Sequence, residues 1–157
     1  MHYSAESSAG PPGPGSTRPL LRDRRPPGPR VFLTDDNAAL RATLRDLFAD
    51  TGIEVVGEAG DGAEALRAIP LVAGASPLVV VMDVRMPGPI NGIEATRLLT
   101  ARRSRAAVIV LTAFPGAGIE QAAREAGAVD VVAKGAPIAE LARAVERAWL
   151  ALAFSAS

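Results

Sequence analysis

The sequence contains no cysteine, which excludes disulfide bonds, thiolate metal sites and a cysteine nucleophile. It also lacks an excess of either charge, because 17 Lys and Arg residues balance 17 Asp and Glu residues. A balanced chain gives no whole-molecule electrostatic reason to bind nucleic acid or an anionic membrane. No stretch approaches the roughly 18 apolar residues that a membrane span requires. We therefore expect neither nucleic acid nor a membrane as a direct partner.

Lysine is also scarce, because Lys134 is the only one and the other sixteen basic residues are Arg. Lysine is a compact point charge on a flexible stem, whereas arginine is a wide planar fork. The single lysine either reflects chance in an Arg-rich composition or marks a position that requires a point charge.

Residues 1–29 differ in composition from the rest of the chain, with seven Pro and four Gly. Such a segment buries too little apolar surface to offset its ordering entropy, which predicts a disordered tail. It has no apolar central run of the secretory type, and together with the absence of cysteine this favours a cytoplasmic protein. The remaining length fits one domain, predicted at 30–153 and followed by a short tail at 154–157.

Short β-branched runs alternate with helical patterns from Arg30 onward. The runs predict strands at 30–35, 53–57, 78–83, 107–112 and 128–132. The middle runs are continuously apolar, as expected of strands that are covered on both faces. Five such strands alternating with helices predict an α/β fold, with a doubly wound parallel sheet and right-handed crossovers.

The helices between these strands carry their own start and stop signals. Asn37, Asp61 and Asn91 are predicted caps, and the last two stand three residues before a Glu. Two further helices are predicted, from about Ile119 to Ala126 and from Pro137 onward. Pro70 is expected to end or kink the second helix.

Polar residues stand where the predicted strands stop. Asp35 and Asp36 follow the first strand, Asp83 ends the third, Thr112 ends the fourth, and Lys134 follows the fifth. In parallel sheets of this kind, ligands bind outside the carboxyl ends of the strands. Any one of these residues alone is typical of a cap or a turn, but their joint occurrence predicts a site.

The residue types at this predicted site favour phosphoryl chemistry. Three carboxylates without a counter-charge would repel one another, and Mg²⁺ relieves such repulsion with carboxylate, water and phosphate oxygens as ligands. Asp83 could then act as a nucleophile on a phosphoryl group. The Lys134 ammonium and the Thr112 hydroxyl would neutralise and contact the phosphoryl oxygens.

Over about residues 30–153 the chain resembles the receiver domain of two-component response regulators. The matching segments are Asp35-Asp36, Met82-Asp83-Val84-Arg85-Met86-Pro87-Gly88, Asn91-Gly92-Ile93-Glu94-Ala95, Thr112-Ala113 and Gly127-Ala128 leading to Lys134. The ending Lys134-Gly135-Ala136, with the helix that begins at Pro137-Ile138, is most similar to receivers of the NarL/LuxR-type group.

The resemblance implies a flavodoxin-like (βα)5 fold with strand order 2-1-3-4-5. It implies that Asp83 accepts a phosphoryl group from a sensor histidine kinase or a phosphotransfer protein, with Thr112 and Lys134 contacting that group. The implied Mg²⁺ ligands are Asp35, Asp36, Asp83 and the backbone carbonyl of Arg85. The resemblance also implies an output partner, which the sequence does not identify, and a homodimer through the fourth and fifth helices.

Three features depart from the pattern of the family. Pro89-Ile90 adds one residue between the Met-Pro-Gly segment and Asn91, beside Asp83. Val131 stands where an aromatic ring is often found, so the switch is expected to be read out without that ring. The chain ends at Ser157, and we expect a stand-alone receiver without a helix-turn-helix effector domain.

Three alternatives remain open at this point. An aspartate-nucleophile phosphohydrolase of the haloacid dehalogenase kind needs a second acid two residues after the nucleophile, where this chain has Arg85. In the second alternative the chain is the receiver part of a DNA-binding regulator. In the third it is a pseudo-receiver that serves only as a binding module. The complete set of acids, Thr112 and Lys134 argues against the pseudo-receiver.

Overall fold

Five strands and five helices alternate along residues 27–74, 76–102 and 105–155, the parts of the chain that the computed structural model describes. The strands are β1 (Arg30–Thr34), β2 (Glu54–Ala59), β3 (Leu78–Asp83), β4 (Ala106–Thr112) and β5 (Asp130–Ala133). The helices are α1 (Ala38–Ala49), α2 (Gly62–Ala73), α3 (Gly92–Ala101), α4 (Ala117–Glu125) and α5 (Ile138–Phe154). The tail predicted at 1–29 lies outside the described residues except for 27–29.

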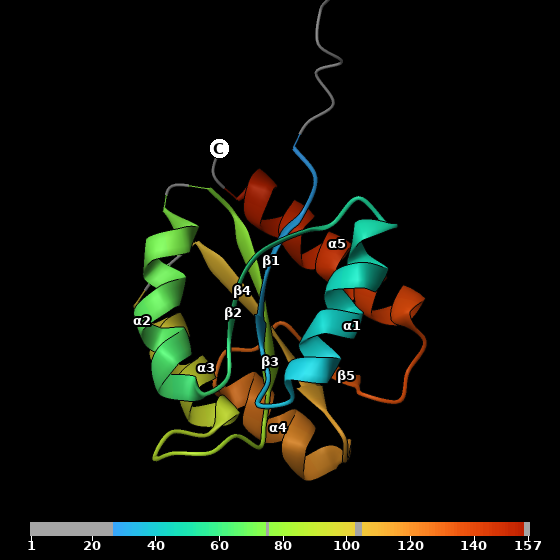
Figure 1. Cartoon of the computed structure of the whole chain (residues 1–157). Helices are drawn as coiled ribbons and strands as arrows, with labels where there is room; N and C mark the ends of the chain where they lie inside the picture. The colour runs from blue at the N-terminus through green and yellow to red at the C-terminus, as the bar shows by residue number, and fades with distance from the viewer. Residues whose placement is uncertain (1–26, 75, 103–104, 156–157) are drawn as a thin grey trace, which may run out of the picture.

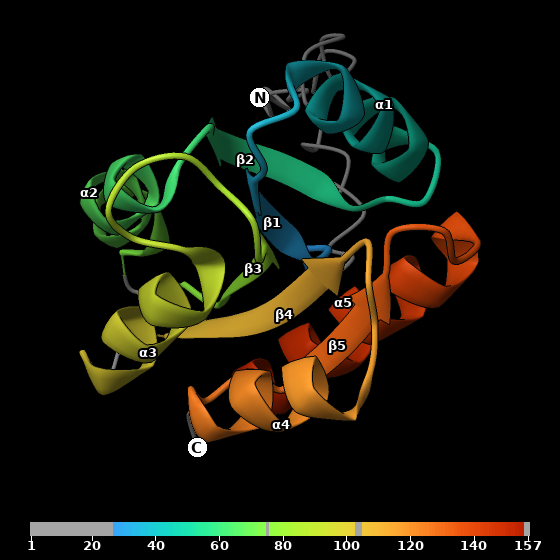
Figure 2. The same ribbon diagram turned by 90° about the horizontal axis from the view of Figure 1, so that it is seen from below.

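The strands form one parallel sheet in the order β2-β1-β3-β4-β5, which confirms the predicted flavodoxin-like fold (Figure 1). Figure 2 shows α1 and α5 on one side of the sheet and α2, α3 and α4 on the other. Each layer of helices encloses its own cluster of buried apolar side chains. The central strand β3 is buried along its whole length, as a strand covered on both faces should be. Because all strands are parallel, their carboxyl ends meet at one edge.

The element boundaries differ slightly from those predicted. Strand β2 continues to Ala59, β5 begins only at Asp130, and α4 begins at Ala117 rather than near Ile119. Gly127 has a φ of +101°, a backbone conformation that suits glycine, and the chain turns there between α4 and β5. The predicted caps are confirmed, because each cap side chain accepts a hydrogen bond from the amide three residues further on.

Pro70 is expected from the sequence to end or kink the second helix, and it does not end the helix, because α2 continues to Ala73. A proline inside a helix removes the amide that would donate to the carbonyl four residues earlier. That carbonyl belongs to Leu66, and it accepts a hydrogen bond from Arg102 Nη1 at 3.2 Å instead. The guanidinium at the end of α3 thus supplies the donor that Pro70 lacks.

Helix α5 is the longest helix in the described part of the chain, and its end is partly apolar. Trp149 and Leu152 are partly buried and pack against the core beneath α5, as favoured for Trp149 from the sequence. Phe154, by contrast, is 76% exposed. Within residues 27–155, where described, no helix is both long and apolar enough to cross a membrane.

Arg102→Met should lower the free energy of unfolding by about 1 kcal/mol, because the Leu66 carbonyl would lose its substitute donor. In a Pro70→Ala background, the amide of residue 70 can donate to Leu66, so the same change should cost much less. Urea denaturation of the four proteins in this double-mutant cycle measures the coupling. Equal costs in both backgrounds would contradict the role assigned to Arg102.

Candidate functional site

The residues predicted at the strand ends come together at the carboxyl edge of the sheet. Asp35 follows β1 and its amide donates to the Ala59 carbonyl at the end of β2, at 3.1 Å. Asp83 is the last residue of β3, the neighbour of β1. The chain after β5 is tied to β4, because the Lys134 amide donates to the Thr112 carbonyl at 2.8 Å. Backbone hydrogen bonds therefore fix the main-chain positions from which these side chains extend.

The Lys134 ammonium lies between two buried carboxylates. Its Nζ is 2.8 Å from Asp35 Oδ2 and 3.1 Å from Asp83 Oδ1. The residues Asp35 and Asp83 are each only 3% exposed, whereas the Lys134 side chain is 23% exposed. The other oxygen of Asp35, Oδ1, accepts the Asn37 amide at 2.9 Å. The only lysine of the sequence is therefore the cation that balances the two buried acids.

Burial and the neighbouring charges shift the pKa values of both Asp83 and Lys134. Burial raises the pKa of Asp83, and the nearby Asp35 carboxylate raises it further. Lys134 and the Arg85 amide favour the charged form of Asp83, but its pKa remains above the ordinary value. Burial disfavours the Lys134 ammonium, yet the ion pairs with Asp35 and Asp83 outweigh this and raise its pKa. Lys134 therefore stays charged at neutral pH, while the ionised form of Asp83 is costly.

Three carboxylates form a group that fits a divalent cation. Asp35, Asp36 and Asp83 each offer an oxygen, and these oxygens lie within 4.8 Å of one another. Asp36 is exposed whereas the other two are buried, so the group opens to solvent on one side. Oxygen ligands with room for water are what Mg²⁺ requires. Arg85, the fourth predicted ligand, directs its backbone amide to Asp83, and the part assigned to its carbonyl stays a prediction.

A cavity of about 250 Å³ opens beside Asp83. It is lined by Asp36, Asp83, Val84, Arg85, Thr112, Ala113, Phe114 and Lys134. The Thr112 hydroxyl oxygen accepts the Phe114 amide at 3.2 Å, which leaves the hydroxyl hydrogen able to donate. The Arg85 guanidinium lies 5.1 Å from the centre of the exposed Phe114 ring, a cation–π contact at the mouth of the cavity.

The loop between β3 and α3, which contains Pro89-Ile90, packs against α2. A Cβ atom at Gly62 would lie only 2.8 Å from the Ile90 carbonyl oxygen, so the loop rests directly on the start of α2. A Cβ at Gly92 would lie 1.7 Å from the Asp83 carbonyl oxygen, so only glycine fits there. The half-buried Ile90 also joins the core beneath α2 and α3. The loop is thus fixed in place beside Asp83.

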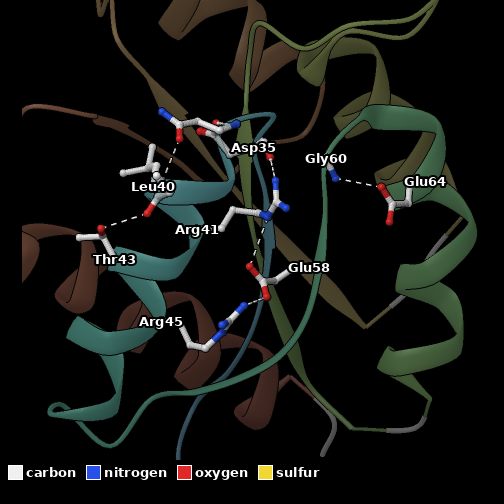
Figure 3. Close-up of polar contacts among 10 residues, drawn as sticks. Asp35, Leu40, Arg41, Thr43, Arg45, Glu58, Gly60 and Glu64 are labelled. Atoms are coloured by element: carbon white, nitrogen blue, oxygen red, sulfur yellow. Dashed lines mark hydrogen bonds and ion pairs between the residues drawn. The ribbon is translucent and has the colours of Figure 1, made fainter.

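Two residues near the site were not singled out from the sequence, and Figure 3 shows how they connect to it. Arg41 on α1 donates from Nη1 to the Asp35 carbonyl oxygen at 2.5 Å. Its Nε lies 3.3 Å from Glu58 Oε1 on β2, and Glu58 also pairs with Arg45. Arginines spaced four residues apart, such as Arg41 and Arg45, are common on exposed helix surfaces. The sequence therefore carries no signal that Arg41 reaches back to Asp35.

Comparison with known proteins gives a consistent result. The sequence model of the response regulator receiver domain matches residues 31–146. Transcriptional regulatory protein PdtaR of Mycobacterium tuberculosis is 39% identical over 119 residues, which cover 76% of this chain and 56% of PdtaR. The DNA-binding transcriptional activator DevR/DosR of the same organism is 42% identical over 118 residues, which cover 74% of this chain and 52% of that protein. The chain thus spans about half the length of these curated relatives.

Solved structures resemble the fold as well. A two-component response regulator of the LuxR family from Aurantimonas is 36% identical, with a TM-score of 0.70 over 80% of this chain and 86% of that chain. The signal receiver domain of the putative response regulator NarL from Mycobacterium tuberculosis is 30% identical. Its TM-score is 0.69, over 76% of this chain and 94% of that chain.

Asp83→Asn should raise the melting temperature at pH 7, because the neutral amide removes a buried charge and its repulsion from Asp35. The pKa of Asp83 is higher in the folded protein than its ordinary 3.8, so the folded state binds this proton more tightly. That stability is present below the ordinary pKa and is lost as pH rises through the raised pKa. The gain from Asp83→Asn should therefore shrink as pH falls toward 4.

Thermal unfolding between pH 4 and pH 7 measures this difference. Asp46→Asn serves as the control, because Asp46 is an exposed carboxylate on α1 away from the site. If Asp83→Asn were less stable than the wild type at pH 7, the ionised Asp83 would be a net stabilising group and the balance described here would be wrong.

Proposed function

The chain belongs to the family of response regulator receiver domains, and from this we propose that it is a phosphoacceptor switch with Asp83 as the phosphorylated residue. One observation carries the proposal. The only lysine bridges Asp83 and Asp35 at the edge of an open cavity, so a carboxylate, its counter-cation and space for a phosphoryl group coincide.

The proposed donor is a phosphohistidine on a sensor histidine kinase or a phosphotransfer protein. One carboxylate oxygen of Asp83 attacks the phosphorus, and a new P–O bond forms while the P–N bond to the imidazole breaks. The imidazole nitrogen keeps the electron pair of the broken bond and takes up a proton from solvent. Reversal to free Asp83 requires a water molecule to attack the same phosphorus, which releases inorganic phosphate.

Mg²⁺ fits the acidic group as its cofactor, held by Asp35, Asp36, Asp83 and, by the resemblance, the backbone carbonyl of Arg85. When bound, it would neutralise negative charge on the phosphoryl oxygens, which is the main electrostatic demand of phosphoryl transfer. The opening at the exposed Asp36 leaves room for water and for an oxygen of the incoming group.

Lys134 and Thr112 are proposed to bind the transferred group. The Lys134 ammonium already contacts Asp83, and it can pair with a phosphoryl oxygen without leaving the pocket. The free hydrogen of the Thr112 hydroxyl can donate to a second oxygen across the same cavity. Ala113 is small, so it leaves the space between them open.

Phosphorylation would change the charge at Asp83 to about −1.5 to −2 and so redistribute the bonds of Lys134 and Thr112. The loops after β3 and β4 carry those residues, so their positions are expected to shift with the phosphoryl group. Val131 is half-buried and packs against the core beneath α2, α3 and α4, so no aromatic ring at this position takes part in the change. The proposed readout is altered affinity for a partner or for a second copy at the face formed by α4 and α5.

A second candidate follows from the comparisons. The relatives PdtaR and DevR/DosR are about twice as long as the matched segment, and the second is named a DNA-binding activator. The chain would then be the receiver part of a longer transcriptional regulator, with Asp83 in the same role. The full reading frame distinguishes this candidate from a stand-alone receiver.

Incubation with acetyl phosphate and Mg²⁺ should add one phosphoryl group to the chain, and Asp83→Asn should abolish the addition. Intact-mass measurement follows the adduct, and peptide mapping locates it. Asp46→Asn should be modified like the wild type, because Asp46 lies on the exposed side of α1. An adduct on another residue would refute the assignment, and sustained turnover of a phosphomonoester would favour a phosphohydrolase.

A further inference from the structure

Within the described part of the chain, no hydrogen bond or ion pair explains how the Asp36 side chain is oriented. It is the exposed member of the acidic group, and among the described residues its carboxylate has no hydrogen bond or ion pair. The backbone around Asp36 therefore sets the direction in which this side chain leaves the main chain, and so whether its carboxylate can reach the other two acids. That backbone consists of the peptide group that joins Asp35 to Asp36, together with the turn into α1.

Arg41 holds this peptide group from the side of α1. Its Nη1 donates to the Asp35 carbonyl oxygen at 2.5 Å, and this carbonyl belongs to the same peptide plane as the Asp36 amide. The turn is fixed on its other side, because the Asn37 amide donates to Asp35 Oδ1. The peptide plane before Asp36 is thus held by Arg41, and the plane after Asp36 by the bond from the Asn37 amide to Asp35.

Glu58 in turn orients the Arg41 guanidinium. Arg41 Nε lies 3.3 Å from Glu58 Oε1, and the two side chains are only 20% and 24% exposed. A guanidinium presents its donors in a rigid fork, so the bond to Glu58 helps to aim Nη1 at the Asp35 carbonyl. Arg45 pairs with the same Glu58 from the next turn of α1, but its side chain is 51% exposed and no contact with Asp35 is found (Figure 3).

We propose that Arg41 is a positioning residue for the divalent cation site: it fixes the peptide between Asp35 and Asp36 so that both carboxylates face the cation. The inference takes from the proposed function only that this acidic group binds Mg²⁺. Residues that hydrogen-bond the ligands of a metal commonly change its affinity when they are replaced, even though they never touch it.

Arg41→Met should weaken Mg²⁺ binding about tenfold, because the Asp35–Asp36 peptide would lose its restraint on the side of α1. Arg45→Met is the matched control, since it breaks an ion pair with the same Glu58 and leaves the bond to Asp35 intact. Arg45→Met should keep the affinity of the wild type. Isothermal titration calorimetry of the full chain with MgCl₂ measures both, without any phosphorylation step.

Arg41→Lys separates positioning from charge. A lysine keeps the positive charge but cannot donate to Glu58 and to the Asp35 carbonyl through one rigid fork, so it should also weaken Mg²⁺ binding. Wild-type affinity in Arg41→Lys would overturn the proposal in favour of a simple charge effect. Equal losses in Arg41→Met and Arg45→Met, or no loss in either, would overturn it as well.

Phosphorylation by acetyl phosphate provides a second readout. In Arg41→Met the Mg²⁺ concentration that gives the half-maximal rate should rise, whereas the rate at saturating Mg²⁺ should stay near that of the wild type. If Arg41→Met fails to fold, Glu58→Gln tests the same point, because it weakens the contact that aims the guanidinium. If Arg41→Met binds Mg²⁺ more weakly than the wild type but acetyl phosphate does not phosphorylate wild-type Asp83, this inference is sustained and the proposed function is refuted.

Discussion

The contact between the Lys134 ammonium and the carboxylates of Asp35 and Asp83 is the interaction on which the rest of the site depends. Both acids are almost fully buried, and in a medium of low polarity two like charges at this separation are costly. The ammonium offsets that cost only in part, which is why the pKa of Asp83 stays raised. A site that holds Asp83 in this state favours anything that brings positive charge or removes negative charge, and a divalent cation does the former.

The strand order makes this contact possible. Asp35 and Asp83 are far apart in sequence, but β1 and β3 are neighbours in the sheet, and their carboxyl ends therefore lie side by side. The sheet then continues through β4 to β5, which brings Thr112 and Lys134 to the same edge. The hydrogen bond from the Lys134 amide to the Thr112 carbonyl links the last two. The site is thus a property of the sheet, and each loop contributes one or two side chains to it.

Arginine and lysine have different tasks in this molecule, which answers the question raised by the single lysine. Arg41 and Arg102 use their planar forks to hold backbone carbonyl groups, at Asp35 and Leu66 respectively. Arg30 does the same for the Val72 carbonyl near the end of α2. The one position that needs a compact charge between two carboxylates has Lys134. These three arginines therefore act through the backbone, whereas the lysine contacts the carboxylates of the site directly.

The sequence by itself determined the elements, the caps and the identity of the strand-end residues, because these depend on local periodicity and on short-range hydrogen bonds. Asn37, Asp61 and Asn91 cap their helices as their spacing indicated, and the polar residues after the apolar runs lie at one sheet edge. Only the tertiary structure decided that α2 continues through Pro70 and that Arg41 reaches Asp35. In both places a guanidinium meets a carbonyl, in the first across 36 positions of sequence and in the second in an orientation that Glu58 helps to fix. Such contacts follow from how helices and strands pack, so no local pattern of residues predicts them.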